Sequence, residues 1–369
     1  MEFVVHRIKD IAKLYSGGDA PEMLSDVRTK QCNVPIFSNG LSNSGLYGYT
    51  DKAQIFEKAI TVSARGTIGA VFYRNEPFFP IVRLISLIPN SELVSTKFLY
   101  YYLKSIPIDG FGTSQQQLTI PFFGKKKIKI IKNIKTQDQI ASILSVYDDL
   151  IEKNNRKIAI LQEMAEELYK EWFVRFRFPG YKTAKFKDGI PEGWAIKKLG
   201  NICQMITGNK DANQATGNGT YPFFTCARET TLTTDEFILD TDAILISGNG
   251  SYTGFVKKFS GKFDLYQRTY ALYNFKDVDW LYVYWVMKTD FEPKHMGGTN
   301  GAAIPYITKP VLEKYKLLVP SKELLSKAGK IFLSFHKQCD LLAKQNYNLT
   351  QQRDLLLPRL MSGKLEVKA

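Results

Sequence analysis

The residue types that most often carry catalysis are few in this chain and do not fall at catalytic spacings. The three histidines, His6, His295 and His336, are each isolated in sequence, and we expect them to be structural or solvated rather than bases or ligands. The four cysteines, Cys32, Cys203, Cys226 and Cys339, are scattered singly without a CxxC pair. This pattern predicts reduced thiols and neither a metal site nor a disulfide framework.

Sequence motifs for phosphate and DNA chemistry are also missing. No GxxxxGK loop followed by Ser or Thr occurs, and HExxH, GxSxG and GxGxxG are absent. The chain has no Pro-Pro dipeptide, as an adenine methyltransferase loop would need, and no Pro-Asp dipeptide, as the nuclease pattern would need. We therefore expect no catalytic residues here, although folding can assemble carboxylates from distant positions.

Charge and hydropathy indicate the kind of partner. Fifty Lys plus Arg against 36 Asp plus Glu leave a net charge of +14, which favours an acidic partner. The run Lys125–Lys127 fits either that basic field or an ordinary solvated surface. No apolar stretch approaches the roughly 20 residues that a membrane span requires, and Met1–Lys13 lacks a signal-peptide core. We expect a cytoplasmic protein without membrane contact.

An internal repeat organises the chain. Ser63-Ala-Arg-Gly-Thr-Ile-Gly69 is echoed in the second half of the sequence by Ser247-Gly-Asn-Gly-Ser-Tyr-Thr-Gly254. Phe98-Leu-Tyr-Tyr-Tyr102 is echoed by Trp280-Leu-Tyr-Val-Tyr284, and we expect both aromatic runs to be core helices rather than base-stacking platforms. The protein is therefore predicted to contain two copies of one unit.

Each copy ends in a long helix-like segment. Apolar residues recur at three-four spacing from Ile140 to Trp172, and a matching stripe runs from Ala328 to Leu356. The first segment would extend roughly 55 Å at 1.5 Å per residue, which suggests a spacer paired with its counterpart in a coiled coil. The cluster Trp172, Phe173, Phe176 and Phe178 is expected to leave surplus apolar surface for a partner.

Two asparagines lie on these stripes. Asn154 and Asn346 could fix the register of a helix pair at some cost in stability, or they could be solvated positions on fraying stripes. When the two helical segments are aligned as repeats, Asn154 is equivalent to Leu342, so the two asparagines do not occupy the same repeat position.

We predict an α+β fold with two repeated α/β domains separated by two long helices. The helices would pair in a coiled coil, and the chain would have a pseudo-two-fold internal repeat. The predicted domains are residues 1–135 and 195–320; the helices are 136–178 and 321–369, and the linker is 179–194.

The chain resembles the DNA-specificity subunits of Type I restriction-modification systems. Three stretches carry the resemblance, which spans nearly the whole sequence: Gln137-Asp-Gln-Ile-Ala141, Ile190-Pro-Glu-Gly-Trp-Ala-Ile-Lys-Lys-Leu199 and Arg353-Asp-Leu-Leu-Leu-Pro-Arg-Leu-Met-Ser-Gly-Lys-Leu365. The N-terminal Phe3–Ile8 segment departs from the pattern, since it has no Trp matching Trp194.

The resemblance implies that each repeated α/β domain is a target-recognition domain and that the two long helices form an antiparallel coiled coil. It also implies a non-catalytic subunit that reads a bipartite, asymmetric site in double-stranded DNA. It implies partners as well: two modification subunits that use S-adenosylmethionine to methylate adenine, and restriction subunits that use ATP and magnesium. No cofactor is expected in this chain itself. Two rival functions remain open, namely a self-contained nuclease or DNA methyltransferase with fused recognition halves, and a coiled-coil adaptor that does not bind DNA.

Candidate DNA-binding residues are Arg, Lys, Asn, Gln and Tyr side chains in loop-like, glycine-rich stretches, because these types contact phosphates and base edges. They are Arg28, Lys30, Asn39, Asn43, Arg65, Gln115 and Gln116 in the first copy, and Lys210, Arg228, Asn249, Tyr252, Arg268 and Asn300 in the second. Arg65 could lie in a structural turn, at a DNA-facing loop tip, or both. Gln115 and Gln116 fit a polar loop or a DNA contact equally well.

Overall fold

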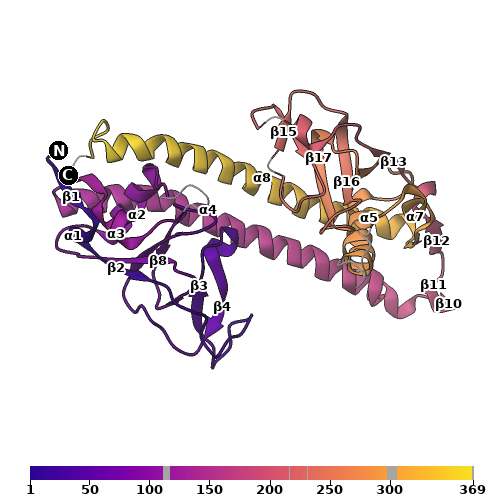
Figure 1. The fold of residues 1–369 in the computed structure, drawn as a ribbon. Helices are drawn as coiled ribbons and strands as arrows, with labels where there is room; N and C mark the ends of the chain where they lie inside the picture. Colours follow the sequence, from indigo (N-terminus) through magenta and orange to yellow (C-terminus); the bar gives the residue numbers. More distant parts are fainter. Residues whose placement is uncertain (111–116, 216, 231, 297–305, 368–369) are drawn as a thin grey trace. The chain divides into compact units, whose positions relative to one another are not determined.

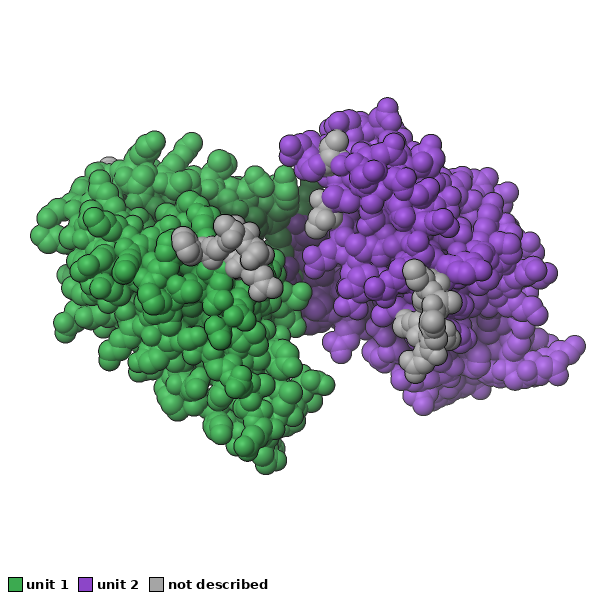
Figure 2. Space-filling view, in the orientation of Figure 1, with its two compact units in different colours: residues 1–154, 344–369 green, residues 155–343 purple. Residues whose placement is uncertain are grey.

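The computed structural model describes residues 1–110, 117–215, 217–230, 232–296 and 306–367. They divide into two compact units, which Figure 2 distinguishes by colour. Unit 1 comprises residues 1–154 and 344–369, and unit 2 comprises residues 155–343. Both chain ends therefore belong to unit 1. They also lie together (Figure 1), where the Met1 amino group is 3.5 Å from Glu366 Oε1.

Unit 1 combines small, mostly antiparallel sheets with helices. Its elements are β1 (Phe3–Arg7), α1 (Ile8–Ile11), β2 (Ala12–Ser16), β3 (Val34–Phe37), η1 (Ser42–Gly45), β4 (Leu46–Thr50), β5 (Ala59–Val62), β6 (Val71–Arg74), β7 (Phe79–Pro80), β8 (Ile85–Pro89), α2 (Thr96–Ser105), α3 (Ile120–Lys125) and β9 (Lys127–Ile131). The sheets have the orders β2-β8-β5-β6, β4-β3-β7 and β1-β9. The strands are short and contain many β-branched residues, which are favoured in strands.

Unit 2 repeats this arrangement. Its elements are η3 (Tyr181–Thr183), β10 (Phe186–Lys187), β11 (Ile190–Pro191), β12 (Ala195–Lys198), η4 (Leu199–Asn201), β13 (Gln204–Thr207), η5 (Ala212–Gln214), β14 (Tyr221–Phe224), β15 (Leu232–Thr234), β16 (Leu239–Ser247), β17 (Val256–Leu265), β18 (Thr269–Tyr273), α5 (Trp280–Val286), η6 (Met287–Phe291), α6 (Glu292–His295), α7 (Lys309–Lys314) and β19 (Lys316–Val319). The six-stranded order β13-β18-β16-β17-β14-β15 corresponds to the two larger sheets of unit 1. The single strand β17 takes the places of β6 and β7, because its second half pairs in parallel with β14 as β7 pairs with β3. The predicted α+β fold with two β-rich regions is confirmed.

Helices α2 and α5 confirm that the two aromatic runs are core helices. Phe98 is fully buried in unit 1, and Tyr282 is 2% exposed in unit 2. The predicted alignment of the runs is nevertheless wrong by half a helical turn. The Leu99 N–H donates to Ser95 O at the start of α2, and the Val283 N–H donates to Asp279 O at the start of α5. Leu99 therefore corresponds to Val283, and Phe98 corresponds to Tyr282 rather than to Trp280.

The two long helices are α4 (Ile134–Tyr169), which continues through a π-helical turn at Lys170–Val174, and α8 (Lys322–Met361). They pack together and are antiparallel. In unit 1 the Asn154 Nδ2 donates to Asn346 Oδ1 at 2.9 Å, and in unit 2 the Cys339 Sγ approaches Ile158 O. Asn154 is 8% exposed, so the register-fixing interpretation is supported over a solvated position.

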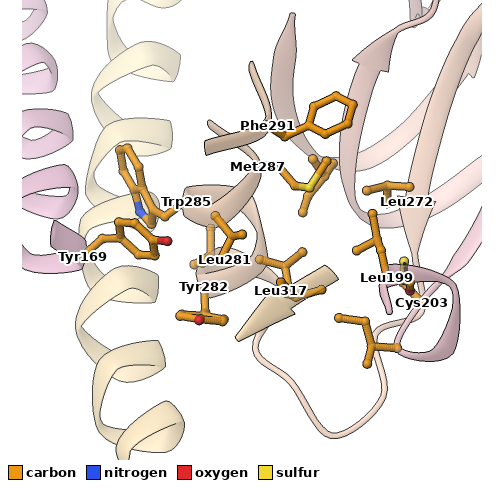
Figure 3. Close-up of a cluster of buried hydrophobic side chains, with 14 of the residues drawn as sticks. Tyr169, Leu199, Cys203, Leu272, Leu281, Tyr282, Trp285, Met287, Phe291 and Leu317 are labelled. Atoms are coloured by element: carbon orange, nitrogen blue, oxygen red, sulfur yellow. Dashed lines mark hydrogen bonds between the residues drawn. The ribbon is translucent and has the colours of Figure 1, made fainter. Parts of the chain in front are cut away.

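Each unit completes its core with parts of both long helices. In unit 1, Leu357, Leu360 and Met361 of α8 join a core that also contains Phe98 and Ile140. In unit 2, Tyr169 of α4 packs with Tyr282 and Trp285 of α5, as Figure 3 shows. The C-terminal stretch that resembles the family is therefore a core element of the first unit.

The aromatic cluster at the end of α4 is partly covered within unit 2, since Trp172 and Phe176 are half-buried. Phe173 is 5% exposed and Phe178 is 9% exposed, because both pack in the core of unit 2 with Trp194 beside them. Trp194 lies 6.0 Å from the Phe173 ring and 5.5 Å from the Phe178 ring between ring centres. The Pro-Glu-Gly-Trp segment thus covers this cluster.

A half-buried ion pair between the long helices gives a testable prediction in unit 1. The Arg353 guanidinium bonds to Asp148 with side chains 14% and 28% exposed, and the Tyr101 hydroxyl donates to Asp148 Oδ2 at 2.6 Å. We expect Arg353→Ala to lower the free energy of unfolding by about 1 to 3 kcal/mol, because it leaves a partly buried carboxylate without its cation. The double variant Arg353→Ala/Asp148→Ala should lose less than the sum of the single variants.

Thermal and urea melts of the full chain measure both effects. Lys327→Ala is the matched control, because its partner Glu323 has a side chain that is 79% exposed and removal of this pair should leave the melt unchanged. A loss in the double variant that equals the sum of the two single losses would show that the pair does not connect α8 to α4.

Candidate nucleic-acid interface

Three loops of unit 1 meet at Asn39. We call residues 38–45, 63–70 and 81–84 the first loop cluster. The Asn39 side chain accepts from the Ala64 N–H at 2.7 Å and donates to Val82 O at 2.6 Å, while its backbone carbonyl accepts from the Thr67 hydroxyl at 2.6 Å. Asn39 therefore holds the three loops in one arrangement, and both ends of its amide already have protein partners.

Arg65 stands at the exposed end of the loop that joins β5 and β6. Gly66 and Gly69 have φ of 67° and 82°, so the loop is the glycine-dependent turn that the sequence predicts. The Arg65 Nη2 donates to Gln117 Oε1 at 3.0 Å. Gln115 and Gln116 lie outside the described residues. The exposed guanidinium keeps further donors for another partner.

Asn43 occupies a left-handed stretch at the edge of this cluster. Asn43 and Ser44 have φ of 49° and 54°, and Asn43 is exposed. The buried Arg74 supports the stretch from below, since its Nη2 donates to Ser44 O at 2.7 Å and its guanidinium lies 3.5 Å from the centre of the Phe37 ring. Burial lowers the pKa of Arg74 to about 9, so this side chain stays cationic at neutral pH.

Two further candidates precede β3. Arg28 is exposed, but its Nη2 pairs with Glu76 at 2.7 Å and its Nε donates to Asn33 O. Lys30 is exposed, and within the described residues it has no hydrogen bond or ion pair. The charge of Arg28 is thus compensated inside the protein, whereas that of Lys30 is not.

The second loop cluster, residues 225–230, 247–255 and 266–269, lies in unit 2. Arg228 is exposed, with its guanidinium 5.8 Å from the Tyr252 ring centre and 5.5 Å from that of Phe255. Tyr252 is 39% exposed. Asn249 is half-buried and forms a β-bridge with Tyr306, whose side chain is exposed. The structure therefore brings Arg228, Asn249 and Tyr252 to one group of loops.

Lys210 has a structural partner instead. Its Nζ lies 2.8 Å from Oδ2 of Asp264, a carboxylate that is only 2% exposed, and 3.1 Å from Glu236 Oε2. The bond to Asp264 is the main reason why the pKa of Lys210 is raised. Lys210 thus compensates a buried charge and also pairs with the exposed Glu236. Asn300 lies outside the described residues.

The two loop clusters share one backbone frame. Five backbone hydrogen bonds of unit 1 have counterparts in unit 2. In unit 1 they run from Ser63 N–H to Ala70 O, Gly69 N–H to Ser63 O, Leu118 N–H to Ala64 O, Ile81 N–H to Phe37 O and Leu84 N–H to Ile81 O. In unit 2, in the same order, they run from Ser247 N–H to Phe255 O, Gly254 N–H to Ser247 O, Ile307 N–H to Gly248 O, Tyr266 N–H to Phe224 O and Thr269 N–H to Tyr266 O. Arg65 corresponds to Asn249 in this frame, as the repeat predicts. Thr67 corresponds to Tyr252.

The frame also identifies a residue that the sequence patterns did not single out. Arg83 precedes Leu84 as Arg268 precedes Thr269, so the two arginines are equivalent positions. Both are exposed. The sequence contains one indication of this equivalence: Arg83 and Arg268 are separated along the chain by nearly the same number of residues as Arg65 and Asn249. Arg83 interrupts an apolar run, however, and a residue in such a run does not resemble a loop residue.

The described residues offer little for catalysis. No group of three or more His, Cys, Asp and Glu side chains that could hold a metal ion occurs among them. His336 is buried beside the Trp280 ring, and burial lowers its pKa. His295 stacks on Phe291 with 4.0 Å between ring centres. Each described helix is also too short or too polar to cross a bilayer.

Comparisons with known proteins give the family. The model of the Type I restriction modification DNA specificity domain matches residues 1–163 and 191–351. The specificity subunit of a Type I restriction enzyme from Escherichia coli is 36% identical over 132 residues, which are 36% of this chain and 29% of that protein. A counterpart from Methanocaldococcus jannaschii is 24% identical over 99% of this chain and 94% of its own length.

The first three relatives match over only 39%, 29% and 45% of their own lengths. The fold itself is similar to the crystal structure of a Type I restriction-modification S subunit from Mycoplasma genitalium. That likeness has a TM-score of 0.62 and 22% identity, and it covers 98% of this chain and 96% of the other. Because the family model covers most of both repeats, the chain belongs to the Type I restriction modification DNA specificity family.

Proposed function

We propose that this chain is the non-catalytic specificity subunit of a Type I restriction-modification complex and reads a bipartite, asymmetric site in duplex DNA. One observation carries the proposal: a single frame of backbone hydrogen bonds occurs twice in one chain of this family. The side chains at equivalent positions of the two frames differ, as Arg65 and Asn249 illustrate. Two similar frames with different side chains are expected to read two different half-sites.

The candidate residues divide by their surroundings into readers and supports. Exposed Arg65, Asn43, Arg228 and Tyr252 are proposed to face DNA, together with half-buried Asn249, exposed Lys30 and the two exposed arginines Arg83 and Arg268. Asn39 and Lys210 are proposed to hold loops in place, because their polar groups are engaged within the protein. Gln115, Gln116 and Asn300 remain candidates on sequence grounds.

The partners and boundaries follow from the same proposal. Two modification subunits with S-adenosylmethionine would methylate adenine, and restriction subunits with ATP and magnesium would translocate and cleave DNA in the cytoplasm. Recognition domains at 1–135 and 195–320 would be held apart by the helices at 136–178 and 321–369, with a linker at 179–194. The net charge of +14 supports a polyanionic ligand.

Two experiments on the purified chain separate this function from its rivals. With DNA, S-adenosylmethionine and magnesium but no partner, we expect neither methylation nor cleavage, whereas a self-contained enzyme would give one of them. A salt titration with duplex DNA addresses the adaptor alternative. Phosphate contacts should make the affinity fall steeply with salt, whereas an adaptor would show no salt-dependent binding.

The proposal predicts that the two half-sites can be exchanged separately. Replacement of residues 195–319 by the equivalent segment of a related subunit should alter one half of the methylated sequence and leave the other unchanged, because base contacts are confined to each loop cluster. Sequencing of methylated adenines in cells with the hybrid checks this. A simultaneous change in both halves would show that the clusters do not act independently.

The long helices are predicted to set the spacing between the half-sites. Insertion of one heptad within residues 152–160 of α4 and another within residues 340–348 of α8 keeps the apolar stripes in register. It lengthens the pair by about 10 Å, or about three base pairs of duplex. The methylated site should keep both half-sites and gain a longer unread spacer.

The same methylation map measures the spacing. A heptad inserted into α4 alone is the control, because it breaks the antiparallel pairing of α4 with α8 and should reduce methylation. Methylation that persists at the original spacing in the matched variant would mean that the helices do not determine the distance.

A further inference from the structure

We infer that Arg83 and Arg268 form a matched pair of phosphate contacts, one in each half of the protein, that positions each loop cluster on DNA without reading sequence. This inference rests on the proposed function. It assigns different tasks to neighbouring side chains: the equivalent arginines contact the phosphate backbone, and the differing positions read bases.

The frame places the two arginines at equivalent positions of a hydrogen-bonded turn, which is left-handed at Val82 and Arg83 but not at Gln267 and Arg268. The Leu84 N–H donates to Ile81 O at 3.1 Å, and the Thr269 N–H donates to Tyr266 O at 2.9 Å. One residue before each arginine, the Val82 N–H donates to Gly18 O at 2.8 Å and the Gln267 N–H donates to Lys210 O at 3.0 Å. These bonds fix the backbone on both sides of each arginine, so its Cα is held while its side chain stays exposed.

Both guanidinium groups are available. Within the part of the chain that the structure describes, neither Arg83 nor Arg268 has an ion pair or a side-chain hydrogen bond. Arg28 and Lys210, by contrast, have carboxylate partners at 2.7 Å and 2.8 Å. An exposed arginine without a carboxylate partner keeps all five donors for a phosphate.

The contrast with the neighbouring positions separates phosphate contact from base reading. Arg65 corresponds to Asn249 and Thr67 to Tyr252, so these positions differ between the two halves. Two half-sites of different sequence require different base readers, but every duplex presents the same phosphate backbone. A cation kept at the same point of both frames therefore fits the feature that both half-sites share.

The backbone at Arg83 shows an additional cost of holding this turn. Val82 and Arg83 have φ of 53° and 60°, a left-handed conformation that a β-branched residue such as Val82 rarely adopts. The Asn39 side chain stabilises it through a bond of 2.6 Å to Val82 O. Strained residues of this kind are concentrated at binding and catalytic sites.

The test is a salt titration of the full chain with a library of random-sequence duplexes, followed by sequencing of the bound fraction. Arg83→Ala and Arg268→Ala should each weaken binding about tenfold at low salt, the fold-change for loss of one charged hydrogen bond. Each should reduce the slope of log affinity against log salt by about 0.9, the value for one phosphate contact. The enriched sequence should stay the same.

Three further variants sharpen the result. Arg83→Lys keeps the positive charge and should retain most of the slope. A bidentate guanine contact would not tolerate this replacement. Arg28→Ala should leave the slope unchanged, because Glu76 already compensates its charge. Asn249→Ala should relax one half of the enriched sequence while keeping the slope. Thermal melts confirm that each variant is folded.

The outcomes are distinct. Unchanged slopes in Arg83→Ala and Arg268→Ala, with steep salt dependence in the natural chain, would overturn this inference and leave the proposed function intact. A changed half-site in either variant would make that arginine a base reader and would also overturn it. Absence of salt-dependent duplex binding by the natural chain would contradict the proposed function itself.

Discussion

The antiparallel packing of α4 and α8 is the constraint on which both units depend. Each unit completes its core with residues from both long helices. Unit 1 needs Leu357, Leu360 and Met361 from the end of α8, and unit 2 needs Ala165 and Tyr169 from α4. A shift of one helix along the other would therefore remove apolar side chains from both cores. The buried amide pair of Asn154 and Asn346 specifies one register, since a slipped pairing would leave an amide facing apolar side chains.

The two units carry different side chains on one shared backbone frame. Hydrogen bonds between main-chain atoms hold the loops, so the exposed side chains can differ without disturbing the fold. The hydrogen bonds that hold the loops together differ in part between the two frames. Unit 1 uses the Asn39 amide, whereas in unit 2 the Arg268 carbonyl accepts from the Gly248 N–H directly at 2.8 Å. Support residues are therefore specific to each unit even where the frame is shared.

Much of this architecture could be predicted from the sequence, and the failures have physical causes. Apolar periodicity and the repeat predicted the long helices, the α+β units and the glycine turn at Gly66, because these features depend on local spacing. Roles that depend on tertiary partners could not be predicted. Lys210 is a DNA-binding candidate by residue type, but its ion pair with the buried Asp264 could not be predicted, because Asp264 lies on a strand distant in sequence. The aromatic runs were misaligned because the similarity of their residues does not determine the register. The register follows from the starts of the two helices, at Ser95 and Asp279.

Under the proposed function, this chain supplies sequence and spacing to enzymes that it does not itself contain. The most direct measurement is a genome-wide map of N6-methyladenine in cells that express the chain together with a candidate modification subunit, and in cells that express each alone. We predict methylation only in the combined cells, at one asymmetric sequence made of two half-sites around an unread spacer. Methylation by this chain alone, or an unbroken or symmetric target in the combined cells, would contradict this function.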